Sequence, residues 1–280
     1  MQANTPKTLD AAWQRIYPVL DILFNRSREG DVGFGAKEYM ECYSIIYNYC
    51  ANSTTGTGSS MIGAHGNAQG PSKSNGEDLY EKLSGFVVDF CNKTSQELSG
   101  LMDEELLQRY NERWSYFLFS RRVMSHQAEY INRQFVTREQ DSHHRVLKLH
   151  DMAVYYWREN VFNPLESKII SQMLKLIKMD REGEAINSSL VKGAVNCLTN
   201  LGLYDDDKAL ETERQGQDLT IYTRAFETPF LQVRRGPLSH VAVDSLATHV
   251  PHPHSHTHGV PHYFSPPTPG HRLLLHGRIA

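Results

Sequence analysis

The stretch Lys37–Cys50, KEYMECYSIIYNYC, decides how the rest of the chain is interpreted. On a helical wheel, one side of this stretch carries Tyr39, Met40, Tyr43, Ile46, Tyr47 and Cys50. The apolar surface is widened by Cys42, Ile45 and Tyr49, so it covers an arc of roughly 220°, about twice what a one-sided surface helix needs. Such a helix is either buried in a bundle or packs on its own core on one side and on a partner on the other. Its tyrosines suit partner binding, because each combines a large contact area with a hydroxyl that tolerates water; the sequence alone leaves both arrangements open.

Helical periodicity recurs on both sides of this stretch. Apolar residues repeat at intervals of three and four over 9–24, 79–90, 103–118, 123–136, 146–162, 169–177 and 190–203. Pro18 predicts a kink or an early end in the first of these helices, and Asp103 predicts an N-cap for the helix that follows it. Since no run alternates long enough for a strand, we expect an all-α fold built by helix-on-helix packing.

Two segments have a different composition. The stretch 51–76 is rich in Gly, Ser, Asn and Thr, which predicts a flexible loop. The last 48 residues, 233–280, hold nine of the 14 His and seven of the 12 Pro, too much proline for a helix. We expect this tail to be disordered or loosely attached.

Charge and composition exclude several classes of function. The chain has 29 Lys+Arg against 32 Asp+Glu, a net charge of −3, and no basic block, which argues against nucleic acid as the main partner. It lacks an apolar run of the roughly 18 residues expected of a spanning helix, and its start lacks the pattern of a secretory signal. The four cysteines form no CxxC pair, which suits a reducing compartment. We therefore expect no membrane partner and a location in the cytoplasm and nucleus.

We find no catalytic constellation and expect neither enzyme activity nor a cofactor. The glycine-rich segment 56–63 lacks the Gly-Lys-Ser/Thr of a phosphate loop, and neither a GxSxG nor an HExxH pattern occurs. Alternating histidines in the tail are the one metal-like feature: His252, His254, His256 and His258. In an extended chain they share one side, but no rigid element or carboxylate holds them, so adventitious metal binding is favoured over a dedicated site.

Five segments in order resemble the N-terminal region of the cullins, in particular the type that scaffolds SCF ubiquitin ligases. They are Lys37–Cys50, EYINRQFVTRE (129–139), DMAVYYWRENVFNPL (151–165), LKLIKMDREGEAIN (174–187) and YTRAFETPFL (222–231). The resemblance covers roughly residues 9–232. It implies a five-helix cullin repeat over 1–163, an incomplete second repeat over 164–232, and a tail foreign to the family over 233–280.

The resemblance also implies a partner and a site. In SCF-type cullins the first repeat docks a Skp-family adaptor that carries an F-box protein, which serves ubiquitin-dependent protein degradation. The positions that match the docking elements are Tyr39, Met40, Tyr43, Ile46, Tyr47, Asn132, Arg133 and Phe135. Phe135 stands where Trp or Tyr is usual, and Cys42 where Leu is common.

The pattern stops at about Val233, which predicts a truncated scaffold segment without the RING-binding and modifier-accepting part. We therefore expect no RING subunit as a partner. Two alternatives remain open at this point: a metal-binding protein that acts through its His-rich tail, and a purely structural helical protein whose tyrosine face is core.

Overall fold

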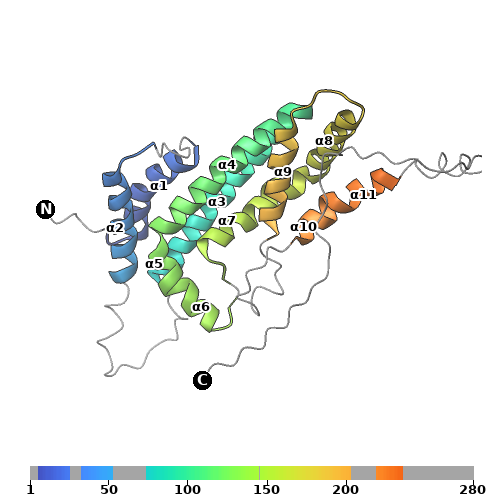
Figure 1. Cartoon of the computed structure of the whole chain (residues 1–280). Coiled ribbons are helices and arrows are strands. Elements are labelled where there is room, and N and C mark those ends of the chain that lie inside the picture. Colours follow the sequence, from blue (N-terminus) through green and yellow to red (C-terminus); the bar gives the residue numbers. More distant parts are fainter. Residues whose placement is uncertain (1–5, 26–32, 53–73, 145, 203–218, 236–280) are drawn as a thin grey trace, which may run out of the picture. The chain divides into compact units, whose positions relative to one another are not determined.

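The computed structural model describes residues 6–25, 33–52, 74–144, 146–202 and 219–235 (Figure 1). Over these ranges the chain is helical and contains no strand, as the all-α prediction requires. The tail from 236 onward, with its four alternating histidines, lies outside the described residues.

Four α-helices make up the first part of the fold: α1 (Leu9–Asn25), α2 (Ala36–Asn52), α3 (Asn75–Ser99) and α4 (Asp103–Gln127). Of the two outcomes predicted at Pro18, a kink or an early end, the early end is wrong, because α1 continues through Pro18 to Asn25. Pro18 lies on the exposed side of the helix, where water can reach the freed carbonyl. α2 and α3 both extend into the predicted loop 51–76, and Ser74 caps α3; residues 53–73 of that loop lie outside the described residues.

Asp103 plays a different part from the predicted N-cap. Met102 occupies the cap position of α4, and Asp103 adopts the left-handed region with φ 52°. Its carboxylate accepts hydrogen bonds from Lys175 Nζ at 2.8 Å and Gln172 Nε2 at 3.1 Å. The side chain therefore links the start of α4 to a distant helix instead of capping its own.

Three later helical segments each contain one five-residue π-helical turn. The first comprises α5 (Glu129–Ile131), η1 (Asn132–Val136) and α6 (Thr137–Asp141). The second comprises α7 (Leu149–Trp157), η2 (Arg158–Phe162) and α8 (Asn163–Arg181). α9 (Ser188–Leu201) follows, and the third comprises α10 (Thr220–Tyr222), η3 (Thr223–Glu227) and α11 (Thr228–Arg235).

The second of these segments runs without a break from Leu149 to Arg181, although two separate helices were predicted there. Pro164 lies in the first turn of α8, directly after the π-helical turn. The predicted division at 163/164 therefore falls inside a continuous helical segment, and within a compact unit that extends to Arg234. The two-repeat division stays a prediction.

An aromatic cluster forms the centre of the core and joins α1, α3, α4 and α7. The ring of Phe117 lies 4.6 Å from that of Trp157 and 6.1 Å from those of Phe24 and Phe90, measured between ring centroids. All four side chains are buried. Aromatic pairs at such separations add about 0.5–1.5 kcal/mol beyond the burial of their apolar area, so the cluster stabilises the packing of α1, α3, α4 and α7, and α2 packs on the first three of these helices.

Candidate partner-binding surface

α2 has two faces that differ in exposure. One face packs into the core and comprises Cys42, Ile45, Ile46, Tyr49 and Cys50, all buried. The other comprises Tyr39, Met40, Tyr43 and Tyr47 and is called here the outer face of α2. Met40 is 55% exposed and Tyr47 is 43% exposed, whereas Tyr39 and Tyr43 are half-buried. Of the two arrangements that the sequence left open, the structure has the one in which only part of the apolar arc is core.

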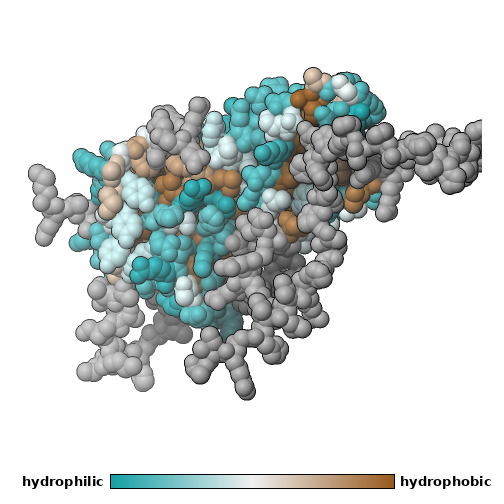
Figure 2. Space-filling view, in the orientation of Figure 1, coloured by the Kyte–Doolittle hydropathy of each residue, from teal (hydrophilic) through white to brown (hydrophobic). Residues whose placement is uncertain are grey.

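The colour of the surface over α2 agrees with this assignment. In the space-filling view, pale and tan side chains gather over α2 at the left, between strongly hydrophilic patches (Figure 2). Pale is the colour of residues of intermediate hydropathy such as tyrosine. The surface is thus neither a polar, fully solvated face nor a large aliphatic patch.

Polar contacts fix the position of α2. The backbone N–H of Gly35 donates to Glu38 Oε2 at 3.0 Å, which satisfies one of the free donors at the start of the helix. Glu41 pairs with Arg15 of α1. At the other end, Asn75 Nδ2 of α3 donates to the carbonyl of Tyr49 at 2.8 Å. The last two contacts join α2 to α1 and α3 and add to the apolar packing that holds it.

The outer face continues from α2 onto α5 through aromatic contacts. Tyr43 and Tyr47 are stacked with ring centroids 6.4 Å apart and planes at 11°. Tyr47 also meets Tyr130 of α5 edge-on, with centroids 4.8 Å apart. Within the described part of the chain, the hydroxyls of Tyr43, Tyr47 and Tyr130 have no hydrogen-bond partner. Their donors and acceptors are therefore free for another molecule.

Asn132 lies beneath this surface, in η1. It is only 6% exposed, and its Oδ1 accepts the backbone N–H of Leu149 at 2.9 Å. Its Nδ2 donates to Glu129 Oε2 at 3.1 Å. Both ends of the amide are thus engaged inside the protein, so Asn132 joins η1 to the first turn of α7.

Phe135 is the second buried residue of η1, at 7% exposure. Its ring lies 5.4 Å from that of Tyr80 of α3, whose hydroxyl donates to the carbonyl of Leu147 at 2.8 Å. A Cβ at Gly76 would lie 3.2 Å from the Cβ of Phe135, tighter than nearly all real contacts. The absence of a side chain at Gly76 lets η1 approach α3 this closely.

The eight predicted residues therefore divide into two layers. Tyr39, Met40, Tyr43, Tyr47 and Arg133 lie at the surface, whereas Ile46, Asn132 and Phe135 are called here the support layer because they are buried in the free chain. Sequence reasoning missed Tyr130, which contacts Tyr47. The sequence could have indicated Tyr130, because it lies three residues before Arg133 and residues at that spacing share one side of a helix.

The cysteines of α2 offer no nucleophile. Burial raises the pKa of both Cys42 and Cys50 to about 12, so these thiols stay protonated at neutral pH. Burial likewise raises the pKa of Cys91 and Cys197. Among the described residues no three His, Cys, Asp or Glu side chains are grouped so as to hold a metal ion. No described helix is long and apolar enough to cross a membrane.

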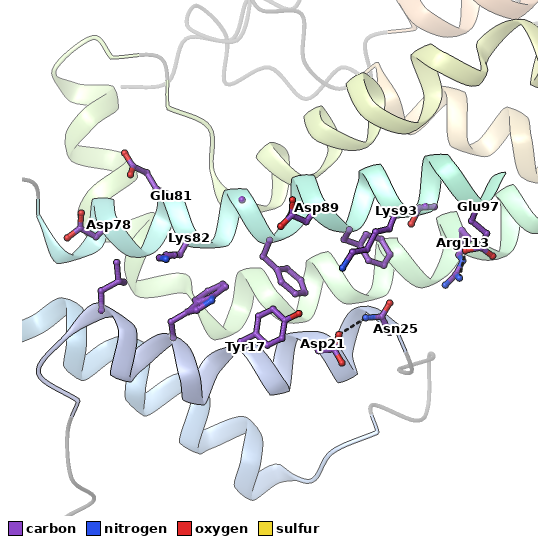
Figure 3. Close-up of a pocket in the computed structure, with 16 residues that line it drawn as sticks. Tyr17, Asp21, Asn25, Asp78, Glu81, Lys82, Asp89, Lys93, Glu97 and Arg113 are labelled. Atoms are coloured by element: carbon purple, nitrogen blue, oxygen red, sulfur yellow. Dashed lines mark hydrogen bonds and ion pairs between the residues drawn. The ribbon is translucent and has the colours of Figure 1, made fainter. Parts of the chain in front are cut away.

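A separate groove of about 510 Å³ lies between α1 and α3 (Figure 3). Trp13, Tyr17, Phe86 and Phe90 supply its aromatic part. Its rim carries charges of both signs, several of which are already engaged: Asp21 accepts from Asn25 Nδ2 at 2.8 Å, and Glu97 pairs with Arg113 (Figure 3). Glu97 also pairs with Arg109. None of the eight predicted residues lines this groove.

The chain has relatives among known proteins. The cullin α-solenoid domain matches residues 8–238, so the chain belongs to the cullin family. Cullin-1 of Caenorhabditis elegans is 31% identical over 250 residues, which are 85% of this chain and 31% of that protein.

Two further relatives are similar over most of the chain. Cullin-1 of Dictyostelium discoideum is 28% identical over 233 residues, which are 82% of this chain and 29% of that protein. Cell division control protein 53 of Saccharomyces cerevisiae is 27% identical over 260 residues, covering 89% of this chain and 30% of that protein. The chain thus spans a little under a third of the length of these relatives.

Proposed function

We propose that this chain acts as a scaffold segment of an SCF-type ubiquitin ligase and that its outer face of α2, together with Tyr130 and Arg133, binds a Skp-family adaptor carrying an F-box protein. In such a ligase the scaffold is not a catalyst. It holds the substrate receptor and the ubiquitin-charged enzyme near each other, which raises the effective concentration of the reacting groups.

The observation that carries the proposal is an exposed aromatic surface built from two elements distant in the sequence. Tyr47 of α2 and Tyr130 of α5 are in contact, and both hydroxyls are free within the described residues. Tyrosine and arginine are enriched among the residues that contribute most to protein–protein binding, and methionine adapts to irregular partner surfaces. Membership in the cullin family and the similarity to Cullin-1 support the choice of a Skp-family adaptor as the partner in this proposal.

The two alternative functions fare differently. A purely structural role predicted that the tyrosine face is core, but Met40 and Tyr47 are 55% and 43% exposed. A metal-binding role would depend on the histidines of the tail, which lie outside the described residues. The metal-binding alternative is tested by deleting 236–280, because the proposed function requires that the shortened chain still bind the adaptor.

A pull-down with a purified adaptor–F-box complex tests the proposal directly. Met40→Glu places a charge in the surface and should abolish capture, because an unpaired charge buried at an interface costs several kcal/mol. The matched control is Met102→Glu: Met102 is 66% exposed and precedes α4, away from the outer face of α2. Equal capture of wild type and Met40→Glu would refute the proposed surface, and failure to capture wild type would refute the partner.

A further inference from the structure

Two of the π-helical turns share a sequence pattern. η1 and the residue after it read NRQFVT (132–137), and η3 with its following residue reads TRAFET (223–228), so both contain Arg-x-Phe-x-Thr. Each turn packs against a long helix, η1 on α3 and η3 on α8. The phenylalanine of each is buried, Phe135 at 7% and Phe226 at 6% exposure. The two turns are therefore comparable position by position.

The arginines at the shared position differ in what they contact. Arg224 of η3 forms a two-pronged ion pair with Glu166 of α8: Nη1 donates to Oε1 at 3.1 Å and Nη2 to Oε2 at 3.0 Å. Arg133 of η1 is exposed, and no hydrogen bond or ion pair engages its guanidinium in the part of the chain that the structure describes. The planar guanidinium matches a carboxylate in this geometry, as the pair in η3 illustrates.

Several other polar groups around η1 already have partners within the chain. Glu129 accepts from Asn132, and the Thr137 hydroxyl donates to the carbonyl of Asn132 at 3.1 Å. Arg138 pairs with Glu139. Among the described residues, Arg133 has no ion-pair partner, and it lies on the same helical segment as Tyr130, which contacts the outer face of α2.

We infer that Arg133 is the charged anchor of the proposed adaptor surface, and that the adaptor presents a carboxylate to it in the geometry of the Arg224–Glu166 pair. The inference rests on the proposed function and adds the chemistry of the partner's contact. A charge matched in this way sets register and selects among partners that share a similar apolar surface. A Skp-like protein without an acidic side chain at this place would be discriminated against.

Titration calorimetry of the full 280-residue chain against the adaptor–F-box complex, at low and at high salt, tests the inference. Arg133→Gln should weaken binding by about tenfold and flatten its salt dependence, because one close charge pair is lost. Arg133→Lys should restore the salt dependence but only part of the affinity, since an ammonium lacks the fork of the guanidinium. The control is Arg224→Gln, which removes the internal counterpart and should leave adaptor affinity unchanged.

Thermal melts of the free variants separate a partner contact from an internal one. Arg133→Gln should melt with the wild type, whereas a lowered Tm would place the missing carboxylate within the chain itself and overturn the inference. If Arg133→Gln binds with the affinity and salt dependence of the wild type, the inference is also overturned. The proposed function stands in that case if Met40→Glu still fails to bind. Absence of wild-type binding would overturn both.

Discussion

The two faces of α2 are built from similar residues, yet they have different surroundings. The inward face has Ile46 and Tyr49 in the core at 1% and 4% exposure, whereas Tyr47, the residue directly after Ile46, is 43% exposed. Composition does not separate them, since isoleucine, tyrosine and methionine all suit either a core or an interface. The difference teaches that stability and binding are assigned to different side chains of a single helix. Substitutions on the two faces should therefore give different phenotypes.

The largest effect is expected on the inward face. Ile46→Ala removes a side chain packed in the core and should lower the free energy of unfolding by about 3 kcal/mol, measured by chemical denaturation. The matched change on the outer face, Met40→Ala, should alter it by less than about 0.5 kcal/mol. Equal losses of unfolding free energy in the two variants would contradict the assignment of stability to the inward face alone.

Asn132, the support-layer residue at the start of η1, should give the next largest effect. Asn132→Ala leaves the buried N–H of Leu149 without its acceptor, which should cost about 2 kcal/mol of unfolding free energy. Asn187→Ala is the control, because that exposed asparagine also accepts a backbone N–H, from Ser189 at 3.2 Å, but caps its own helix. Loss of an exposed cap should cost about 1 kcal/mol. A smaller loss at Asn132 than at Asn187 would show that Asn132 is not a structural link.

His150 lies in the first turn of α7, which Asn132 contacts, and it should make the free energy of unfolding depend on pH in acid. Burial, together with the charges of Arg121, Arg122 and His126, lowers the pKa of His150 from 6.5 to about 4. The unfolded chain therefore takes up a proton as the pH falls below about 6.5, while the folded chain resists it until about 4. The free energy of unfolding should decrease across that range, and His150→Gln should show a shallower decrease in pH-dependent denaturation. An identical slope in both proteins would contradict the assignment.

The smallest effect is expected from the internal ion pair of η3. Arg224 and Glu166 have side chains that are 59% and 25% exposed, so their pair is largely screened by water. Arg224→Gln should lower the free energy of unfolding by less than about 1 kcal/mol. A loss as large as that of Ile46→Ala would mean that the Arg224–Glu166 pair contributes as much to stability as a core side chain. The pair would then not be a valid comparison for the exposed Arg133.

The sequence predicted the helices well but not which side chains they expose. Intervals of three and four located most segments, because burial of one face requires that period. The wide arc of α2 could not distinguish Ile46 from Tyr47, since both are apolar enough for either side. Only packing against α1, α3, α4 and α5 determines which one is covered.

The π-helical turns were the main feature beyond the reach of periodicity. Each turn inserts an extra residue into the helical repeat and shifts the faces on which later side chains lie. Asn132 and Phe135, expected at the surface, are buried in such a turn, whereas Arg133 between them is exposed. Comparison of the chain with itself at Arg133 and Arg224 would have exposed the shared pattern. The carboxylate that engages Arg224 becomes visible only in three dimensions.

One pair of tyrosines tests the central claim most directly. Tyr47 and Tyr17 are 43% and 42% exposed and both touch other aromatic rings, but Tyr17 lies on α1 at the groove with α3. Calorimetric binding of the adaptor–F-box complex should weaken by about 2 kcal/mol in Tyr47→Ala, roughly 30-fold in Kd, and stay within about twofold of wild type in Tyr17→Ala. Unchanged binding in Tyr47→Ala, or an equal loss in Tyr17→Ala, would contradict the assignment of the outer face of α2 as the partner-binding surface.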